Sequence, residues 1–157
     1  MVWIKDMPIQ YITGDATAPI GTGKKIIAHV CNDVGKWGKG FVLAILKRWP
    51  HPKALYLKSK STLALGVVQL VQVERELWVA NMVAQRGIRT EAGVPPIRYD
   101  ALEQCLKELG LYAHQLQASV HMPRIGCGLA GGKWEQVEPL IADTLPRTQV
   151  FVYDLPI

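Results

Sequence analysis

A short apolar run, KIIAHV at residues 25–30, constrains the fold of this chain more than any other feature. A continuous run of this length is typical of a strand buried on both faces, as strands of a parallel sheet are. A glycine-rich turn from Asn32 to Gly40 follows, and a helical pattern then continues to Arg48 and stops before Pro50. A buried strand, a turn and a helix in this order predict an α/β fold.

Strand-like and helix-like segments alternate along the rest of the chain. Apolar and β-branched runs predict further strands at residues 9–13, 67–73, 77–83, 119–123 and 149–153. The second and third of these flank the turn Glu74-Arg75-Glu76 and predict an antiparallel hairpin. Helices are expected after Pro52, over 99–112 and over 134–145. The pattern predicts a three-layer α/β/α sandwich around a mixed central sheet, with a ligand at the C-terminal strand ends.

The composition fits one domain over residues 1–157 and excludes disordered, collagen-like and coiled-coil classes, because 49% of residues are hydrophobic and 20% are charged. No apolar run approaches the roughly 20 residues of a membrane span, so no membrane partner is expected. The charged start MVWIKD is not typical of a secretory signal. Three widely spaced cysteines, Cys31, Cys105 and Cys127, favour a reducing compartment, and we expect a cytoplasmic protein.

Two glycine-rich segments each link a predicted strand to a predicted helix. The motif His29–Gly40 contains the first glycine loop (residues 32–40), and four glycines occur within seven residues of the second (residues 123–132). Backbone amides in such loops, and at the helix starts that follow them, attract anions. The formal net charge of +5 favours an anionic partner, although it is also compatible with a role in solubility alone. The two loops together predict a phosphorylated ligand.

Other readings of the same residues are weaker. The segment Gly21-Thr22-Gly23-Lys24-Lys25 lacks the first glycine and the final Ser or Thr of a P-loop and leads into a strand. Cys127 is a candidate nucleophile with His121 or His29 as its base, but we favour a small residue that fits a glycine turn. The four histidines have no metal-ligand spacing, so we expect no metal and no cofactor. Trp37 lies in the first glycine loop and is a candidate cover for a ligand.

Three segments together resemble the macrodomain family, whose members bind ADP-ribose. They are Gly14-Asp15-Ala16-Thr17, His29–Gly40 and Met122–Trp134, and the resemblance covers nearly the whole chain. The stretch MPRIGCGLAGGKWEQV is similar to one branch, which includes terminal ADP-ribose protein glycohydrolase and ADP-ribose 1''-phosphate phosphatase. The resemblance implies a macrodomain-like sandwich and an ADP-ribose ligand.

The resemblance also implies a role for individual positions. Asp15 would hold the adenine amino group with Ala16 beside it, and Tyr153 would border the adenine. Asn32 would face the distal ribose. The remaining contacts are implied for Gly38, Lys39 and Gly40 along the ribose and phosphates, and for the backbone around the diphosphate at Ile125, Gly126, Cys127, Gly128, Leu129 and Ala130.

Two departures from this branch change the expected chemistry. The branch has an aspartate where this chain has Ala130, and a nucleophilic lysine where this chain reads Gln85-Arg86. A water-based mechanism is therefore expected, with Asn32, Asp33 and His29 as the candidate catalytic residues. Because an asparagine orients water without deprotonating it, turnover should be slow. His29 is equally well explained as a buried, satisfied histidine.

Three functions follow as alternatives. The first is binding of ADP-ribose with hydrolysis of ADP-ribosyl esters or ADP-ribose 1''-phosphate. The second is a non-catalytic reader of ADP-ribosylated protein or nucleic acid. The third is a basic nucleic-acid-binding domain that uses Arg86, Arg89 and Arg98, although the chain lacks the aromatic-plus-basic pattern of single-strand binders. We also hypothesise that Arg86 or Arg89 clamps a phosphate in place of the missing lysine.

Overall fold

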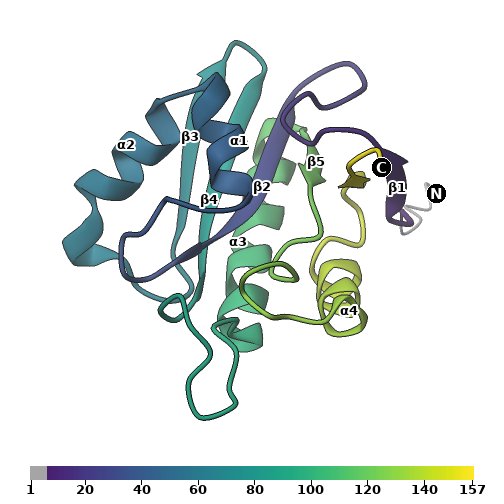
Figure 1. The fold of residues 1–157 in the computed structure, drawn as a ribbon. Helices are drawn as coiled ribbons and strands as arrows, with labels where there is room; N and C mark the ends of the chain where they lie inside the picture. The colour runs from purple at the N-terminus through teal and green to yellow at the C-terminus, as the bar shows by residue number, and fades with distance from the viewer. Residues whose placement is uncertain (1–6) are drawn as a thin grey trace.

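The computed structural model describes residues 7–157, which form a single six-stranded sheet with helices on both faces (Figure 1). The predictions made for the first six residues lie outside this range. The elements in chain order are β1 (Gln10–Thr13), β2 (Lys25–Asn32), α1 (Phe41–Arg48), α2 (His51–Lys58), the 3-10 turn η1 (Lys60–Thr62), β3 (Val68–Glu74), β4 (Leu77–Gln85), α3 (Tyr99–Leu116), β5 (Ser119–Met122), α4 (Trp134–Thr144) and β6 (Val150–Asp154).

The sheet is mixed, as predicted, with the strand order β1-β6-β5-β2-β4-β3. Every neighbouring pair is parallel except β3 and β4, which form the expected antiparallel hairpin. The two strands that precede the glycine loops, β2 and β5, are hydrogen-bonded neighbours. Because the carboxyl ends of parallel strands meet at one edge, the two glycine loops lie at the same edge of the sheet.

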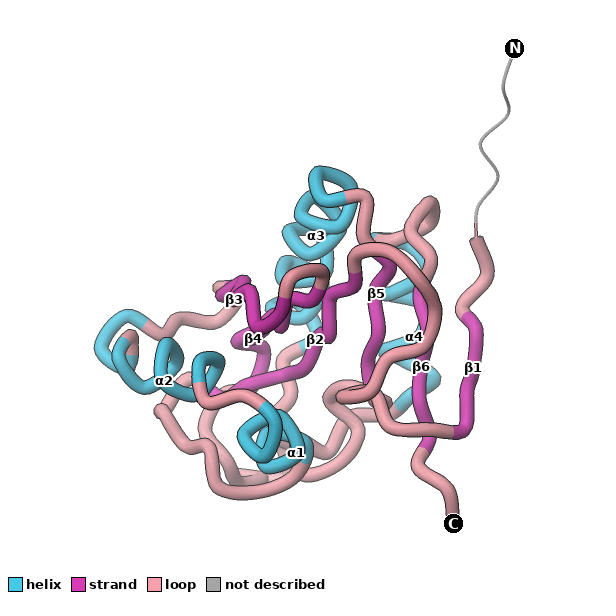
Figure 2. The backbone as a smooth tube through the Cα atoms, turned by 90° about the horizontal axis from the view of Figure 1, so that it is seen from above, coloured by secondary structure: helices cyan, strands magenta, loops and turns pink. Residues whose placement is uncertain are grey.

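Alternating side chains of the central strands divide the core into two layers. Ile26 and Ala28 of β2 face a large cluster with α3 and α4, whereas Ile27 and Cys31 face a smaller cluster with α1 and α2. Seen from above, the two helix pairs lie on opposite sides of the sheet (Figure 2). This arrangement confirms the predicted three-layer sandwich and explains why the run at residues 25–30 is apolar throughout.

Three elements, β2, β4 and α3, are longer than the sequence predicted. β2 continues to Asn32 because Cys31 and Asn32 still pair with the longer strand β4. α3 continues to Leu116 and ends where Gln117 adopts the left-handed conformation, with its N–H bonded to carbonyls of the last turn. Within residues 7–157, no helix has the length and apolar character that crossing a membrane requires.

Candidate functional site

A cavity of about 300 Å³ lies between the two glycine loops, at the C-terminal edge of the sheet. Eight of the predicted site residues line it: His29, Lys39, Gly40, Ile125, Gly126, Gly128, Leu129 and Ala130. The structure therefore brings these eight predicted residues together around one cavity. The other six lining residues were not among the predicted site residues: Val30, Phe41, Val42, Gln85, Pro123 and Arg124. Arg124 and Phe41 each adjoin a predicted loop residue, which is the signal that could have found them.

The second glycine loop closes on itself through its own backbone. The Gly132 N–H donates to the Gly126 oxygen at 2.7 Å, and the Gly131 N–H donates to the Gly128 oxygen at 3.1 Å. Gly126 and Gly131 have φ values of 72° and 76°, which side-chain-bearing residues rarely adopt. A Cβ at Gly132 would lie 2.4 Å from the Gly126 oxygen. Glycine is thus required by the backbone here, and positive φ values of this kind are typical of anion-binding nests.

Asn32 holds the first glycine loop in place from the end of β2. Its Oδ1 accepts hydrogen bonds from the Val34 N–H and the Lys36 N–H, both at 3.1 Å, and from the Tyr56 hydroxyl at 2.8 Å. Its Nδ2 donates to the Lys36 oxygen at 2.8 Å. The side chain is buried and is not part of the cavity lining. The amide that we expected to orient water is therefore bonded to its own loop and to Tyr56 of α2.

Asp33 connects the first glycine loop to the long loop at residues 86–98. Its Oδ1 accepts a hydrogen bond from the Gly87 N–H at 2.8 Å, and its own N–H donates to the Gln85 oxygen. The carboxylate is half-buried, and within residues 7–157 its second oxygen has no hydrogen-bonding partner. Of the three candidate catalytic residues, Asp33 is the one whose side chain keeps a free acceptor.

His29 lies under the cavity within β2, with a side chain only 1% exposed. Its Nε2 is 2.6 Å from the Asn81 Oδ1, while the Asn81 Nδ2 donates to the Pro52 oxygen and the Gln69 Oε1, both at 3.1 Å. The Asn81 oxygen is thus the acceptor, and His29 carries its proton on Nε2. Burial lowers the pKa of His29 to about 4, and the bond to Asn81 offsets this only in part. The geometry matches a satisfied core histidine.

Two other expectations from the sequence are settled by the packing. Trp37 is 5% exposed and donates from Nε1 to the Val42 oxygen at 3.0 Å, so the expectation that it covers a ligand is wrong. It instead packs with Tyr56 in the α1 and α2 core. Cys127 is half-buried, burial raises its pKa, and no hydrogen bond within the described residues joins it to a histidine. It matches the small loop residue that we favoured over a nucleophile.

Asp15 lies apart from the cavity, in the turn that follows β1. Its Oδ1 accepts the Thr17 N–H at 2.8 Å and the Thr17 hydroxyl at 2.7 Å, while its Oδ2 lies 3.7 Å from a guanidinium nitrogen of Arg48. Burial acts to raise the pKa of Asp15, but the Thr17 bonds and the Arg48 charge outweigh it, and the net shift is downward. The turn therefore presents an ionised carboxylate with one oxygen already committed.

Tyr153 and Ala16 form a small apolar group beside Asp15. Both are buried and pack with Phe151, and Phe41 contacts the same group while it also lines the cavity. The Tyr153 hydroxyl accepts the Ile20 N–H at 3.0 Å and lies 2.6 Å from the His121 Nδ1. Phe41 thus connects the cavity to the Asp15 turn. The residues predicted to contact adenine therefore adjoin those predicted to contact the ribose and diphosphate.

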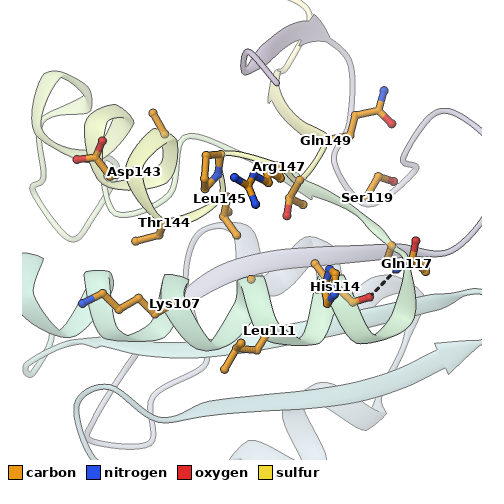
Figure 3. A pocket seen from close by; sticks show the side chains of 16 residues that line it. Lys107, Leu111, His114, Gln117, Ser119, Asp143, Thr144, Leu145, Arg147 and Gln149 are labelled. Atoms are coloured by element: carbon orange, nitrogen blue, oxygen red, sulfur yellow. Dashed lines mark hydrogen bonds between the residues drawn. The ribbon is translucent and has the colours of Figure 1, made fainter. Parts of the chain in front are cut away.

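A larger hollow, of about 750 Å³, lies at the other end of the sheet (Figure 3). It is lined by the C-terminal turns of α3 and α4 and by the residues that begin β5. Helix C-termini present carbonyl oxygens and disfavour anions, and neither glycine loop reaches this hollow. Within residues 7–157, no group of three His, Cys, Asp or Glu side chains is arranged to hold a metal ion.

No protein-family model matches the chain. A Bacteroides thetaiotaomicron protein of unknown function is 55% identical, with a TM-score of 0.93, over 95% of this chain and 99% of its own. A macrodomain protein from Streptomyces coelicolor is 51% identical, with a TM-score of 0.84, over 94% of this chain and 99% of its own. The chain belongs to the macrodomain family.

More distant relatives share the same region. A mouse chromodomain-helicase-DNA-binding protein 1-like is 35% identical over 94% of this macrodomain, which corresponds to only 18% of the helicase's length. An ADP-ribose 1''-phosphate phosphatase from Lodderomyces elongisporus is 27% identical over 94% of this macrodomain and 98% of its own chain. The phosphatase thus has the size of this macrodomain, whereas the helicase contains a similar region within a much longer protein.

The two positions that depart from the expected branch have structural roles in this macrodomain. Ala130 is buried, and its oxygen accepts the Ile97 N–H at 3.0 Å. Gln85 lines the cavity, and its Nε2 donates to the Gly87 oxygen at 3.0 Å. Arg86 and Arg89 are exposed and are not part of the lining. The cavity therefore offers neither an aspartate at 130 nor a lysine at 85, and its cationic lining residues are Lys39 and Arg124.

Proposed function

We propose that this macrodomain binds ADP-ribose with its diphosphate in the cavity between the glycine loops. The observation that carries this proposal is the closed backbone of the second glycine loop, which lines the cavity at Ile125, Gly126 and Gly128. Free loop amides beside Lys39 suit a diphosphate. The nearby Asp15 carboxylate suits an exocyclic amino group, since it keeps one oxygen that Thr17 does not bond.

The positions of the adenine and the distal ribose follow from the order of the Asp15 turn, Phe41 and the cavity along the protein. The adenine would lie between the Asp15 turn and Tyr153, with Phe41 between the base and the diphosphate. The distal ribose would lie along Gly38–Gly40, at the start of α1, where the cavity reaches Lys39 and Gly40. A macromolecule attached to the distal ribose would then extend out of the cavity at this end.

We further propose slow hydrolysis at the distal ribose by water. The phosphatase relative, whose whole chain matches this macrodomain, supports ADP-ribose 1''-phosphate as a substrate. In that reaction water adds, the phosphate ester bond breaks, and ADP-ribose and inorganic phosphate leave. His29 and Asn32 are held by structural bonds, so Asp33 is the remaining side chain that can accept a proton from water, directly or through the ligand's phosphate.

One observation favours the second candidate function, a non-catalytic reader. Among residues 7–157, no carboxylate lines the cavity, because Asp33 lies outside the lining and position 130 is alanine. A site without a positioned base binds its ligand and releases it unchanged. In either case we place the protein in a reducing compartment such as the cytoplasm, because Cys31, Cys105 and Cys127 are all free thiols.

Incubation with ADP-ribose 1''-phosphate separates the two functions. The protein should release inorganic phosphate and ADP-ribose, measured by chromatography under single-turnover conditions. Asp33→Asn, which keeps an oxygen for the Gly87 N–H, should slow release by about 10²-fold or more, whereas Asp143→Asn, on α4, should not. Tight binding without release would identify a reader. Unchanged release by Asp33→Asn would refute Asp33 as the base.

A further inference from the structure

Arg124 lies near the start of the second glycine loop and forms an ion pair with Asp154 at the end of β6. Its Nε donates to the Asp154 Oδ1 at 2.7 Å, and one terminal nitrogen donates to the Oδ2 at 2.9 Å. This is the two-pronged geometry in which arginine binds a carboxylate most strongly. The hydrogen bonds that Arg124 donates to Asp154 raise the pKa of Arg124 and lower the pKa of Asp154. Both groups therefore stay charged.

Two aromatic rings hold the same guanidinium. Its central carbon lies 5.2 Å from the ring centroid of Tyr11 and 5.2 Å from that of Trp134, within cation–π range. Trp134 in turn donates from Nε1 to the Tyr11 hydroxyl at 3.0 Å, and that hydroxyl donates to Glu138. These five residues, Arg124, Asp154, Tyr11, Trp134 and Glu138, form the Arg124 cluster.

The Arg124 cluster fastens both ends of the second glycine loop. Arg124 precedes Ile125, and Trp134 is the first residue of α4, just after the loop's last glycines. The other members come from β1, β6 and the second turn of α4, so the loop is tied to three elements of the framework. Fixing the ends of a glycine-rich loop restricts its conformations before the ligand binds. Less conformational entropy is then lost on binding.

We propose that Arg124 is a positioning residue that pre-forms the diphosphate cradle, an inference that rests on the proposed function for its ligand. Its guanidinium acts through the loop rather than on the phosphate, since Asp154 occupies its Nε and one terminal nitrogen. The role depends on the planar fork, which bonds both Asp154 oxygens while the guanidinium lies against the Tyr11 and Trp134 rings. A lysine lacks this fork, although it carries the same charge.

Hydrogen–deuterium exchange of the ligand-free protein tests the proposal without any ligand. Arg124→Lys and Arg124→Gln should each speed amide exchange in residues 126–132 about tenfold or more, while α3 stays at the parent's rate. Arg75→Gln changes an exposed arginine in the hairpin turn and should leave the loop unchanged. Parent-like exchange of the loop in Arg124→Gln, or rescue by Arg124→Lys, would overturn the proposal.

Calorimetry then connects the loop to the ligand. Both Arg124 variants should bind ADP-ribose about tenfold more weakly than the parent, at temperatures where thermal unfolding shows that they are folded. Full affinity in Arg124→Lys would mean that the charge alone matters, and it would contradict the positioning role. If the parent itself fails to bind, the proposed function fails, and loop exchange still decides whether the Arg124 cluster orders the loop. Tyr11→Phe, which removes only the bridging hydroxyl, replaces any Arg124 variant that does not fold.

Discussion

At the scale of single residues, Asp15 shows how one carboxylate serves structure and proposed recognition together. One oxygen closes the turn through Thr17, and the other faces Arg48 at 3.7 Å. A substitution that keeps the first oxygen and changes the second therefore separates the two roles.

Asp15→Asn should weaken ADP-ribose binding by about tenfold or more, because a hydrogen bond to a charged group contributes roughly 1.5–3 kcal/mol. Its remaining oxygen still accepts the Thr17 N–H, so thermal stability should change little. Calorimetric titration measures the affinity, with Asp143→Asn on α4 as the matched control. Parent-like affinity in Asp15→Asn would exclude the proposed adenine contact.

Two glycines of the second glycine loop predict opposite results for the same added methyl group. Gly132→Ala places its Cβ 2.4 Å from the Gly126 oxygen and should cost about 2 kcal/mol or more in unfolding free energy. Gly128→Ala meets no atom within 4 Å and should unfold at the parent's temperature. Because Gly128 lines the cavity, its methyl group should instead weaken ADP-ribose binding. Denaturant unfolding and calorimetry measure the two effects, and equal stabilities of the two variants would contradict the loop geometry.

The glycine loops could be predicted from the sequence, but the hydrogen-bonding roles of individual polar residues in and beside them could not. Glycine spacing is local and can be read directly, which is why the cavity walls were predicted. The bonds of His29 and Asn32 involve Asn81 and Tyr56, which are distant in the chain. The expectation that Trp37 covers a ligand was wrong for the same reason. Its packing against Tyr56 depends on how α2 folds back, which the local sequence does not show.

At the scale of elements, the end of β2 and the first glycine loop form one unit held by Asn32. Four hydrogen bonds of its amide, to Val34, Lys36 and Tyr56, fix the loop. Element types and order could be predicted because apolar runs and helical spacing are local. The extra residues of β2, β4 and α3 could not be predicted, because pairing between β2 and β4 and a left-handed cap on α3 extend them.

Asn32→Ala should lower the unfolding free energy by about 1–3 kcal/mol, since it leaves buried partners unsatisfied. Amide exchange should rise in residues 33–40 and stay unchanged in β6. Gln115→Ala, at an exposed position of α3, is the control. If Asn32→Ala keeps the parent's stability and loop protection, Asn32 does not organise the loop, and its direct role toward a ligand gains support.

At the scale of the whole molecule, two buried histidines couple the fold to pH. Burial lowers the pKa of both His29 and His121 to about 4, and a nearby positive charge on Lys25 adds to the effect at His121. Both are neutral in the folded protein, and they lie on two different strands of the sheet. Protonation therefore favours the unfolded chain, in which a histidine titrates near its ordinary value.

The histidine contribution to stability should fall as the pH drops from about 6.5 toward 4, by up to about 3 kcal/mol per histidine, and should level off below that range. The sign follows because the unfolded chain binds more protons than the folded one within this window. Denaturant unfolding between pH 7 and pH 5 measures the slope. The variant His51→Gln/His114→Gln, which changes two exposed histidines, should keep the same slope. A flat profile would contradict the neutral, buried assignment.

The central claim for the whole molecule is that the two glycine loops form an ADP-ribose site. Calorimetric titration of the purified protein with ADP-ribose tests it most directly. We predict saturable binding of one ADP-ribose per chain, competed by ADP, which carries the adenine and the diphosphate. No binding heat up to about 1 mM ligand, where even a weak site would be occupied, would contradict the claim.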